Sequence, residues 1–177
     1  LQADGPVGVL RGLATLRQLL ETGPGGAASL PLVAIDDAPR FPWRGVMIDT
    51  ARHFMSVDTI KRQIDAMEQV KLNVLHLHLS DNEAFRVESR RYPRLHEVAG
   101  HGQFYTQGQI RELVAYAADR GVRVAPEFDV PGHARAMQPV GNPQQQQRQG
   151  HDGQFEDQQI SVPPRALVAE AAASPMV

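Results

Sequence analysis

The sequence contains no cysteine, which excludes disulfide bonds and thiolate metal sites. It has no apolar run near the ~20 residues that a membrane-spanning helix needs. The formal net charge of −2 gives no reason to expect a nucleic acid or an anionic membrane as a partner. Hydrophobic residues make up 42% and charged residues 21% of the chain, a composition that indicates a globular protein.

The N-terminal residues lack the basic start and the apolar centre of a signal peptide. The sequence opens on Leu1 rather than on Met, so we expect the natural N-terminus to lie upstream. Without cysteines, the composition leaves the redox compartment undetermined.

What the sequence does contain is an alternation of strands and helices. Strands are expected at 45–49, 73–80 and 122–129. Ser56 is the expected N-cap of a helix between the first two strands, and its buried stripe should be Ile60, Ile64, Met67 and Val70. Thr106 opens a second helix with a capping box, and Gly121 is expected to end it. Upstream, the spacing predicts a helix at 9–20 and a short strand at 30–35.

The strand expected at 73–80 has two different faces. Leucines alternate with His76, His78 and Ser80, and Asp81 follows directly. A face that carries two imidazoles and then an aspartate favours a polar pocket at the end of the strand.

Each of the three strands is followed or closed by an aspartate, namely Asp49, Asp81 and Asp129. Alternating strands and helices predict a parallel sheet, and ligands bind at the carboxyl ends of such strands. We therefore expect the three acids to share a polar site. The first strand is not followed by Gly-x-Gly-x-x-Gly, so a (β/α)8 barrel is favoured over a dinucleotide-binding fold, although three strands cannot close a barrel.

Two segments depart from this pattern. The connection 81–105 is longer than the ~2–6 residues usual in compact α/β units, and long connections tend to be functional. Residues 136–177 are rich in Gln and Pro without an apolar period, which predicts a disordered or linker segment.

The polar residues allow more than one interpretation. His76 and His78 could be hydrogen-bonded residues filling a barrel interior, or they could ligate a metal as a His-x-His pair completed by Asp81 or His133. Arg44 precedes the first strand, where its planar donors suit either ligand hydroxyls or a structural Arg–Asp pair.

Residues 40–54, 71–81 and 126–134 resemble the first three strands of the catalytic barrel of family 20 glycoside hydrolases, the β-N-acetylhexosaminidases. Residues 104–106 and the helix that follows them also match in order and spacing. Residues 8–35 are similar to the end of the small α/β domain that precedes this barrel. The resemblance thus implies an α/β chain with the end of the small domain at 1–38, the first part of an incomplete (β/α)8 barrel at 39–135, and an unrelated tail at 136–177.

The family removes terminal N-acetylglucosamine or N-acetylgalactosamine by a retaining mechanism in which the acetamido oxygen of the substrate attacks the anomeric carbon. By resemblance, Asp81 and His133 form a relay to the general acid. Arg44 matches the arginine that binds sugar hydroxyls, and Asp129 matches the strand-end acid that helps fix the network at the substrate. The resemblance implies a glycan partner, no cofactor and no metal, and a secreted, periplasmic or lysosomal type of compartment.

The sequence also departs from the family. Residues 81–86 read Asp-Asn-Glu-Ala-Phe-Arg instead of the usual Asp-Asp-Gln-Gly-Trp-Arg. The family's general acid belongs to an Asp-Glu pair at the end of the fourth strand, and no Asp-Glu dipeptide occurs here. Trp43 is the only tryptophan, whereas several line the family's sugar pocket.

We therefore expect a truncated or wrongly joined copy with little or no activity by itself. The alternatives are a non-catalytic carbohydrate-binding remnant, a His-x-His metal-dependent hydrolase, and a fragment that does not fold independently because strand edges and faces stay uncovered.

Overall fold

A computed structural model describes residues 1–137 of the chain. The predicted disordered tail therefore lies outside the described residues, apart from its first two positions. The elements are α1 (Pro6–Leu19), β1 (Glu21–Thr22), η1 (Pro24–Gly26), β2 (Ala28–Ser29), β3 (Gly45–Asp49), α2 (Val57–Gln69), β4 (Val74–Ser80), α3 (Arg94–Ala99), α4 (Gln107–Ala118), β5 (Arg123–Phe128) and η2 (Arg135–Met137).

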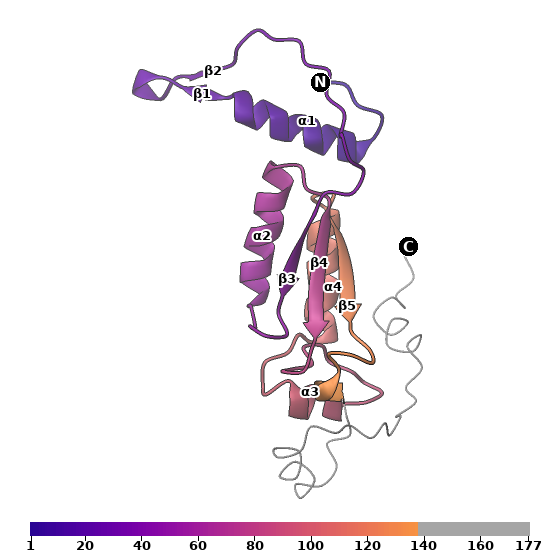
Figure 1. The fold of residues 1–177 in the computed structure, drawn as a ribbon. Helices are drawn as coiled ribbons and strands as arrows, with labels where there is room; N and C mark the ends of the chain where they lie inside the picture. Colours follow the sequence, from indigo (N-terminus) through magenta and orange to yellow (C-terminus); the bar gives the residue numbers. More distant parts are fainter. Residues whose placement is uncertain (138–177) are drawn as a thin grey trace, which may run out of the picture. The chain divides into compact units, whose positions relative to one another are not determined.

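The expected parallel sheet is present, with the strand order β3-β4-β5 (Figure 1). At the beginnings of the strands, the backbone N–H of Asn73 donates to the carbonyl of Arg44, and the N–H of Arg123 donates to the carbonyl of Asn73. Just past the end of β3, the N–H of Thr50 donates to the carbonyl of His78 in β4. Strands whose beginnings and ends pair in this way are parallel. Their carboxyl ends therefore meet at one edge of the sheet.

The chain divides into two compact units. One contains residues 1–48, 55–77 and 110–126, and the other contains 49–54, 78–109 and the described residues from 127 onward. The carboxyl ends of β3, β4 and β5 all belong to the second unit. The division does not fall at residue 38, where the family resemblance places a domain boundary, and that boundary stays a prediction.

Helix α2 begins where the sequence predicts. The side chain of Ser56 accepts a hydrogen bond from the N–H of Thr59 and so satisfies a free donor of the first turn. Three residues of the predicted stripe, Ile60, Ile64 and Met67, are buried. The fourth is not, because Val70 is the C-cap, where the backbone has left the helical conformation and the side chain is exposed.

Helix α4 has the predicted caps at both ends. The side chain of Gln109 accepts from the N–H of Thr106 at 2.8 Å, and the hydroxyl of Thr106 accepts from the N–H of Gln109 at 3.1 Å. Gly121 follows the helix with φ of +65°, a conformation that glycine adopts without strain. The hydroxyl of Tyr116 in α4 donates to Asp65 in α2 at 2.7 Å, and Arg120, which follows α4, forms an ion pair with the same carboxylate.

The strand predicted at 30–35 is wrong. The antiparallel pair in this region is formed by β1 and β2, and the backbone from Leu30 onward is irregular. The large side chains of this stretch, Leu30, Leu32, Val33 and Ile35, are exposed. An apolar run becomes a strand only where another strand satisfies its N–H and carbonyl groups, and the described residues offer it none.

The long connection after Asp81 is ordered. It contains α3, a bridge between Ser80 and Phe85, and a second bridge between Val87 and Tyr105. Phe85 and Tyr105 are buried, and their rings stack on Phe128 and Phe54, so apolar contacts with residues outside the connection help to hold it. Within residues 1–137, no helix combines the length and the apolar character that crossing a bilayer requires.

The capping box predicts a specific loss of stability. The substitution Thr106→Ala should lower the free energy of unfolding by about 1 kcal/mol, because the N–H of Gln109 loses its acceptor. Urea unfolding followed by circular dichroism measures the change. Thr106→Ser keeps the hydroxyl and serves as the control, and equal losses in both variants would contradict the capping role.

Candidate active site

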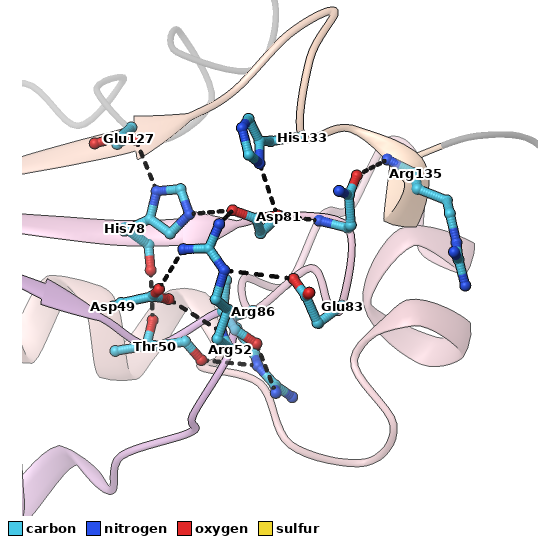
Figure 2. Close-up of polar contacts among 12 residues, drawn as sticks. Asp49, Thr50, Arg52, His78, Asp81, Glu83, Arg86, Glu127, His133 and Arg135 are labelled. Carbon is cyan, nitrogen blue, oxygen red and sulfur yellow. Dashed lines mark hydrogen bonds and ion pairs between the residues drawn. The ribbon is translucent and has the colours of Figure 1, made fainter.

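The side chain of Asp81 is the centre of the polar cluster at the carboxyl ends of the strands (Figure 2). One oxygen, Oδ2, lies 2.5 Å from Nη2 of Arg52 and 3.0 Å from Nε2 of His78. The other, Oδ1, accepts from the backbone N–H of Asn82 at 2.6 Å and from Nδ1 of His133 at 3.2 Å. A carboxylate offers about four acceptor positions. All of them are therefore filled by groups of the protein.

These donors keep Asp81 ionised although only 1% of its surface is exposed. Burial by itself raises the pKa of a carboxyl group. The hydrogen bonds from Asn82, His78 and His133 and the charge of Arg52 outweigh burial and lower the pKa of Asp81 to about 2. At neutral pH the group is thus a fixed negative charge.

The imidazole of His78 lies between two carboxylates. Its Nδ1 is 2.7 Å from Oε1 of Glu127 and its Nε2 is 3.0 Å from Oδ2 of Asp81. Burial lowers the pKa of His78, but the two hydrogen bonds and the charges of Glu127 and Asp49 outweigh it and raise the pKa. Both ring nitrogens can donate only when the ring is protonated. The cluster therefore favours an imidazolium ion between two anions.

Arg52 connects the end of β3 to this cluster. Asp49 closes β3 and accepts two hydrogen bonds from Arg52, one from the backbone N–H at 3.0 Å and one from Nη1 at 2.6 Å. Burial opposes ionisation of Asp49, but the bonds from Arg52 prevail and lower its pKa. Nε of Arg52 is 3.7 Å from a carboxylate oxygen of Glu83, in the loop after β4. The side chain of Arg52 remains 47% exposed, so part of its guanidinium group faces solvent.

Asp129 also reaches the cluster, because its carboxylate lies with ligand atoms of His78 and Asp81 within 4.8 Å. These three residues are those best placed to hold a metal ion among the described ones. The site fits a metal poorly, since Asp81 already faces the cation of Arg52 and both nitrogens of His78 already face carboxylates. His76 does not belong to this group, so the alternative interpretation of a His-x-His metal pair completed by Asp81 is not supported.

The structure brings together three of the four predicted site residues, Asp81, Asp129 and His133. Arg44 lies just before β3, at the opposite end of the strand from Asp49. Its Nη1 donates to the carbonyl of Phe41 and its Nε donates to the carbonyl of Lys71. These contacts are structural, and neither is an Arg–Asp pair. Its role as a sugar ligand stays a prediction that this placement does not favour.

Arg52 and Glu127 are two residues of the cluster to which the sequence patterns assign no role. The signal for Arg52 was its position three residues after the acid that closes a strand, within reach of the same sheet edge. Glu127 lies in β5, two residues before Asp129, which follows the strand, and both carboxylates lie near His78. That spacing could have indicated a partner for His78.

Parallel strands with acids and imidazoles at their carboxyl ends define an α/β protein with a polar site at one edge of its sheet. Comparison with known families specifies the class further. Residues 41–171 match the model described as "Glycosyl hydrolase family 20, catalytic domain". This chain belongs to glycosyl hydrolase family 20. The match continues past residue 135, where the resemblance recognised in the sequence ends.

Curated relatives that match this chain are named beta-hexosaminidases. A beta-hexosaminidase of Akkermansia muciniphila is 43% identical over 148 residues, which cover 77% of this chain and 30% of that protein. A beta-hexosaminidase A of Caenorhabditis elegans is 52% identical over 103 residues, covering 57% of this chain and 19% of that protein. The chain therefore spans less than a third of the length of these relatives.

Solved structures of family 20 enzymes superpose on this chain. A glycoside hydrolase family 20 β-N-acetylglucosaminidase superposes with a TM-score of 0.73 at 43% identity, over 76% of this chain and 29% of that one. A chitobiase of Flavobacterium johnsoniae superposes with a TM-score of 0.71 at 47% identity, over 73% of this chain and 20% of that one. The α/β fold of the described residues is thus a fold found in this family.

The charged cluster predicts how stability depends on pH. The folded-state pKa of Asp81 lies below its ordinary value of 3.8, so its contribution is present above pH 3.8 and is lost as the pH falls toward 2. The folded-state pKa of His78 lies above its ordinary value of 6.5, so its contribution is present below pH 6.5 and is lost as the pH rises through the raised pKa. These two contributions together are therefore largest between pH 3.8 and 6.5.

Urea unfolding at a series of pH values measures this profile. The acid side should lose about 2 kcal/mol through Asp81, and Asp81→Asn should flatten that side. The control His78→Gln should flatten the alkaline side. An acid side that is unchanged in Asp81→Asn would contradict the assignment.

Proposed function

We propose that this chain carries the proton-relay part of a glycosidase site that removes terminal N-acetylglucosamine or N-acetylgalactosamine from glycoconjugates or chitooligosaccharides. The observation that supports the proposal best concerns the carboxylate of Asp81. It is buried, its acceptor positions are occupied by donors of the protein, and its pKa is lowered so that it stays ionised. An anion of this kind does not need to bind substrate itself. It orients the imidazole of His133, whose side chain is 57% exposed and can meet a group from outside the cluster.

The reaction follows from the family resemblance. The acetamido oxygen of the substrate attacks the anomeric carbon and displaces the leaving oxygen, which takes a proton from a carboxylic acid. His133, hydrogen-bonded to Asp81 through Nδ1, would present its other nitrogen to that acid and so tune its proton affinity. Asp129 would help to fix the network at the substrate.

Arg52 is the arginine that we assign to sugar hydroxyls, in place of Arg44. Two carboxylates, Asp49 and Asp81, hold its guanidinium group at the end of the sheet, and nearly half of the side chain stays exposed. A guanidinium group has five N–H donors in one plane, so donors remain for a ligand. The donors of Arg44 at Nε and Nη1 are used by backbone carbonyls.

We also propose that β3, β4 and β5 are the first strands of a (β/α)8 barrel. The parallel order, the two intervening helices and the polar residues at the carboxyl ends support this assignment. The end of the small preceding domain at 1–38 and the barrel part at 39–135 keep the limits predicted from the sequence.

The chain as it stands should have little or no hydrolytic activity, because it contains no Asp-Glu dipeptide to supply the proton donor. Glu127 is the remaining candidate in the cluster, but its Oε1 is engaged with Nδ1 of His78 at 2.7 Å. A carboxyl group held in this contact is poorly placed to give a proton to a leaving group.

A second function, carbohydrate binding without turnover, is favoured by one observation. The exposed guanidinium of Arg52 is preorganised by carboxylates and does not depend on the missing acid. Such a remnant would bind N-acetylglucosamine reversibly and leave it unchanged.

The activity prediction is tested by assaying the purified chain on a chromogenic N-acetylglucosaminide. We expect no turnover above the buffer blank, with the Akkermansia muciniphila relative as the positive control. Turnover close to that of the relative would overturn the proposal. In that event Glu127→Gln would show whether this carboxyl group is the donor.

The exchange of roles between the two arginines is tested by titrating N-acetylglucosamine and following the amide NMR spectrum. Arg52→Gln should weaken binding by roughly tenfold or more, because a charged donor to the sugar is lost. Arg44→Gln should lower the melting temperature, because two backbone carbonyls lose their donor. Its affinity for N-acetylglucosamine, measured below the unfolding transition, should be unchanged. The reverse pattern would return the sugar contact to Arg44, and an unmodified chain that does not bind would exclude the binding function.

A further inference from the structure

Arg86 is a buried cation whose contacts the relay does not explain. The residue is 6% exposed, and burial lowers the pKa of its guanidinium group. Removing such a group from water is strongly unfavourable unless hydrogen bonds replace its hydration. The contacts of Arg86 are therefore expected to fix something that the fold needs.

All four hydrogen bonds that the guanidinium group makes with described residues go to main-chain carbonyls. Nε donates to Thr50 and Nη2 donates to Ala51, each at 3.0 Å. Nη1 donates to Gly100 and to Gln103, also at 3.0 Å. The group thus joins two separate loops, the turn that follows β3 and the end of the long connection after β4.

The turn after β3 is also hydrogen-bonded to β4. The N–H and the hydroxyl of Thr50 both donate to the carbonyl of His78, at 3.1 and 2.8 Å. Thr50 and Ala51 are fully buried, and Arg52 is the next residue along the chain. The main chain that carries Arg52 is therefore fixed between β4 and Arg86.

The guanidinium group also lies against a ring. Its central carbon is 5.6 Å from the ring centre of Phe54, which in turn stacks on Tyr105 at 4.9 Å. Arg86 is itself held by its backbone, since its N–H donates to Leu79 and its carbonyl accepts from the N–H of Tyr105. The backbone of Arg86 thus contacts Tyr105 directly, and its side chain contacts the ring of Phe54 that stacks on Tyr105.

We propose that Arg86 is a positioning residue that sets where the guanidinium group of Arg52 lies relative to Asp81. The expected consequence for saccharide affinity rests on the proposed function, whereas the placement of Arg52 does not. Lysine cannot replace Arg86, because one ammonium group cannot donate four hydrogen bonds to carbonyls in two different loops.

The test compares the resolved 15N guanidinium resonances of Arg52 in folded variants of this chain. In the unmodified chain the ion pairs with Asp49 and Asp81 should hinder rotation of the group and keep its Nη signals apart. Arg86→Lys should collapse these signals into one average. The matched control Arg120→Lys removes a guanidinium group that pairs with Asp65 in the other compact unit, and it should leave the signals of Arg52 unchanged.

A folded Arg86→Lys variant with unchanged Arg52 signals would overturn the proposal, as would the same collapse in Arg120→Lys. If Arg86→Lys does not fold, Phe54→Leu decides by the same criterion, because it removes the ring that packs on the guanidinium group. Signals that persist in a folded Phe54→Leu variant would then overturn it.

Saccharide binding provides the second measurement. If the unmodified chain binds N-acetylglucosamine, Arg86→Lys should weaken binding by about tenfold, and it should cause no further loss once Arg52→Gln is present. Additive losses would indicate that Arg86 does not act through Arg52. A collapse of the Arg52 signals without saccharide binding in any variant would exclude the saccharide-binding function and leave the positioning role of Arg86 standing.

Discussion

The carboxylate of Asp81 is the interaction on which the rest of the site depends. It is buried directly after the central strand, and a buried carboxylate without donors would take up a proton or destabilise the fold. Here an arginine, two imidazoles and a backbone N–H satisfy it. The same contacts that keep the charge stable also fix the positions of Arg52, His78 and His133.

The cluster alternates in charge. Cationic Arg52 separates Asp49 from Asp81, and the ring of His78 separates Asp81 from Glu127. Opposite charges a few ångströms apart in a weakly hydrated place interact strongly, and each group is oriented by the next. An arrangement of this kind is preorganised, because its dipoles and charges do not have to move when a ligand arrives.

Two kinds of support hold this arrangement. The parallel sheet brings three strand ends to one edge, which explains why acids far apart in the chain meet. The loops then need separate fixation, since loop carbonyls lack the partners that a sheet supplies. Arg86 provides it by donating to four of them, and this is why a cation is tolerated in a buried position.

Local sequence patterns specify the strand at 45–49, the caps at Ser56 and Thr106, the turn at Gly121, and the acids at the strand ends. These features depend on residues a few positions apart, where periodicity and capping act. The tertiary structure alone decided that Arg52 rather than Arg44 reaches the acids, and that the stretch at 30–35 is not a strand. It also decided the pairing of His78 with Glu127, 49 positions away, and of Arg86 with Thr50, 36 positions away. Such contacts form only when the sheet has brought distant segments together, so no local pattern specifies them.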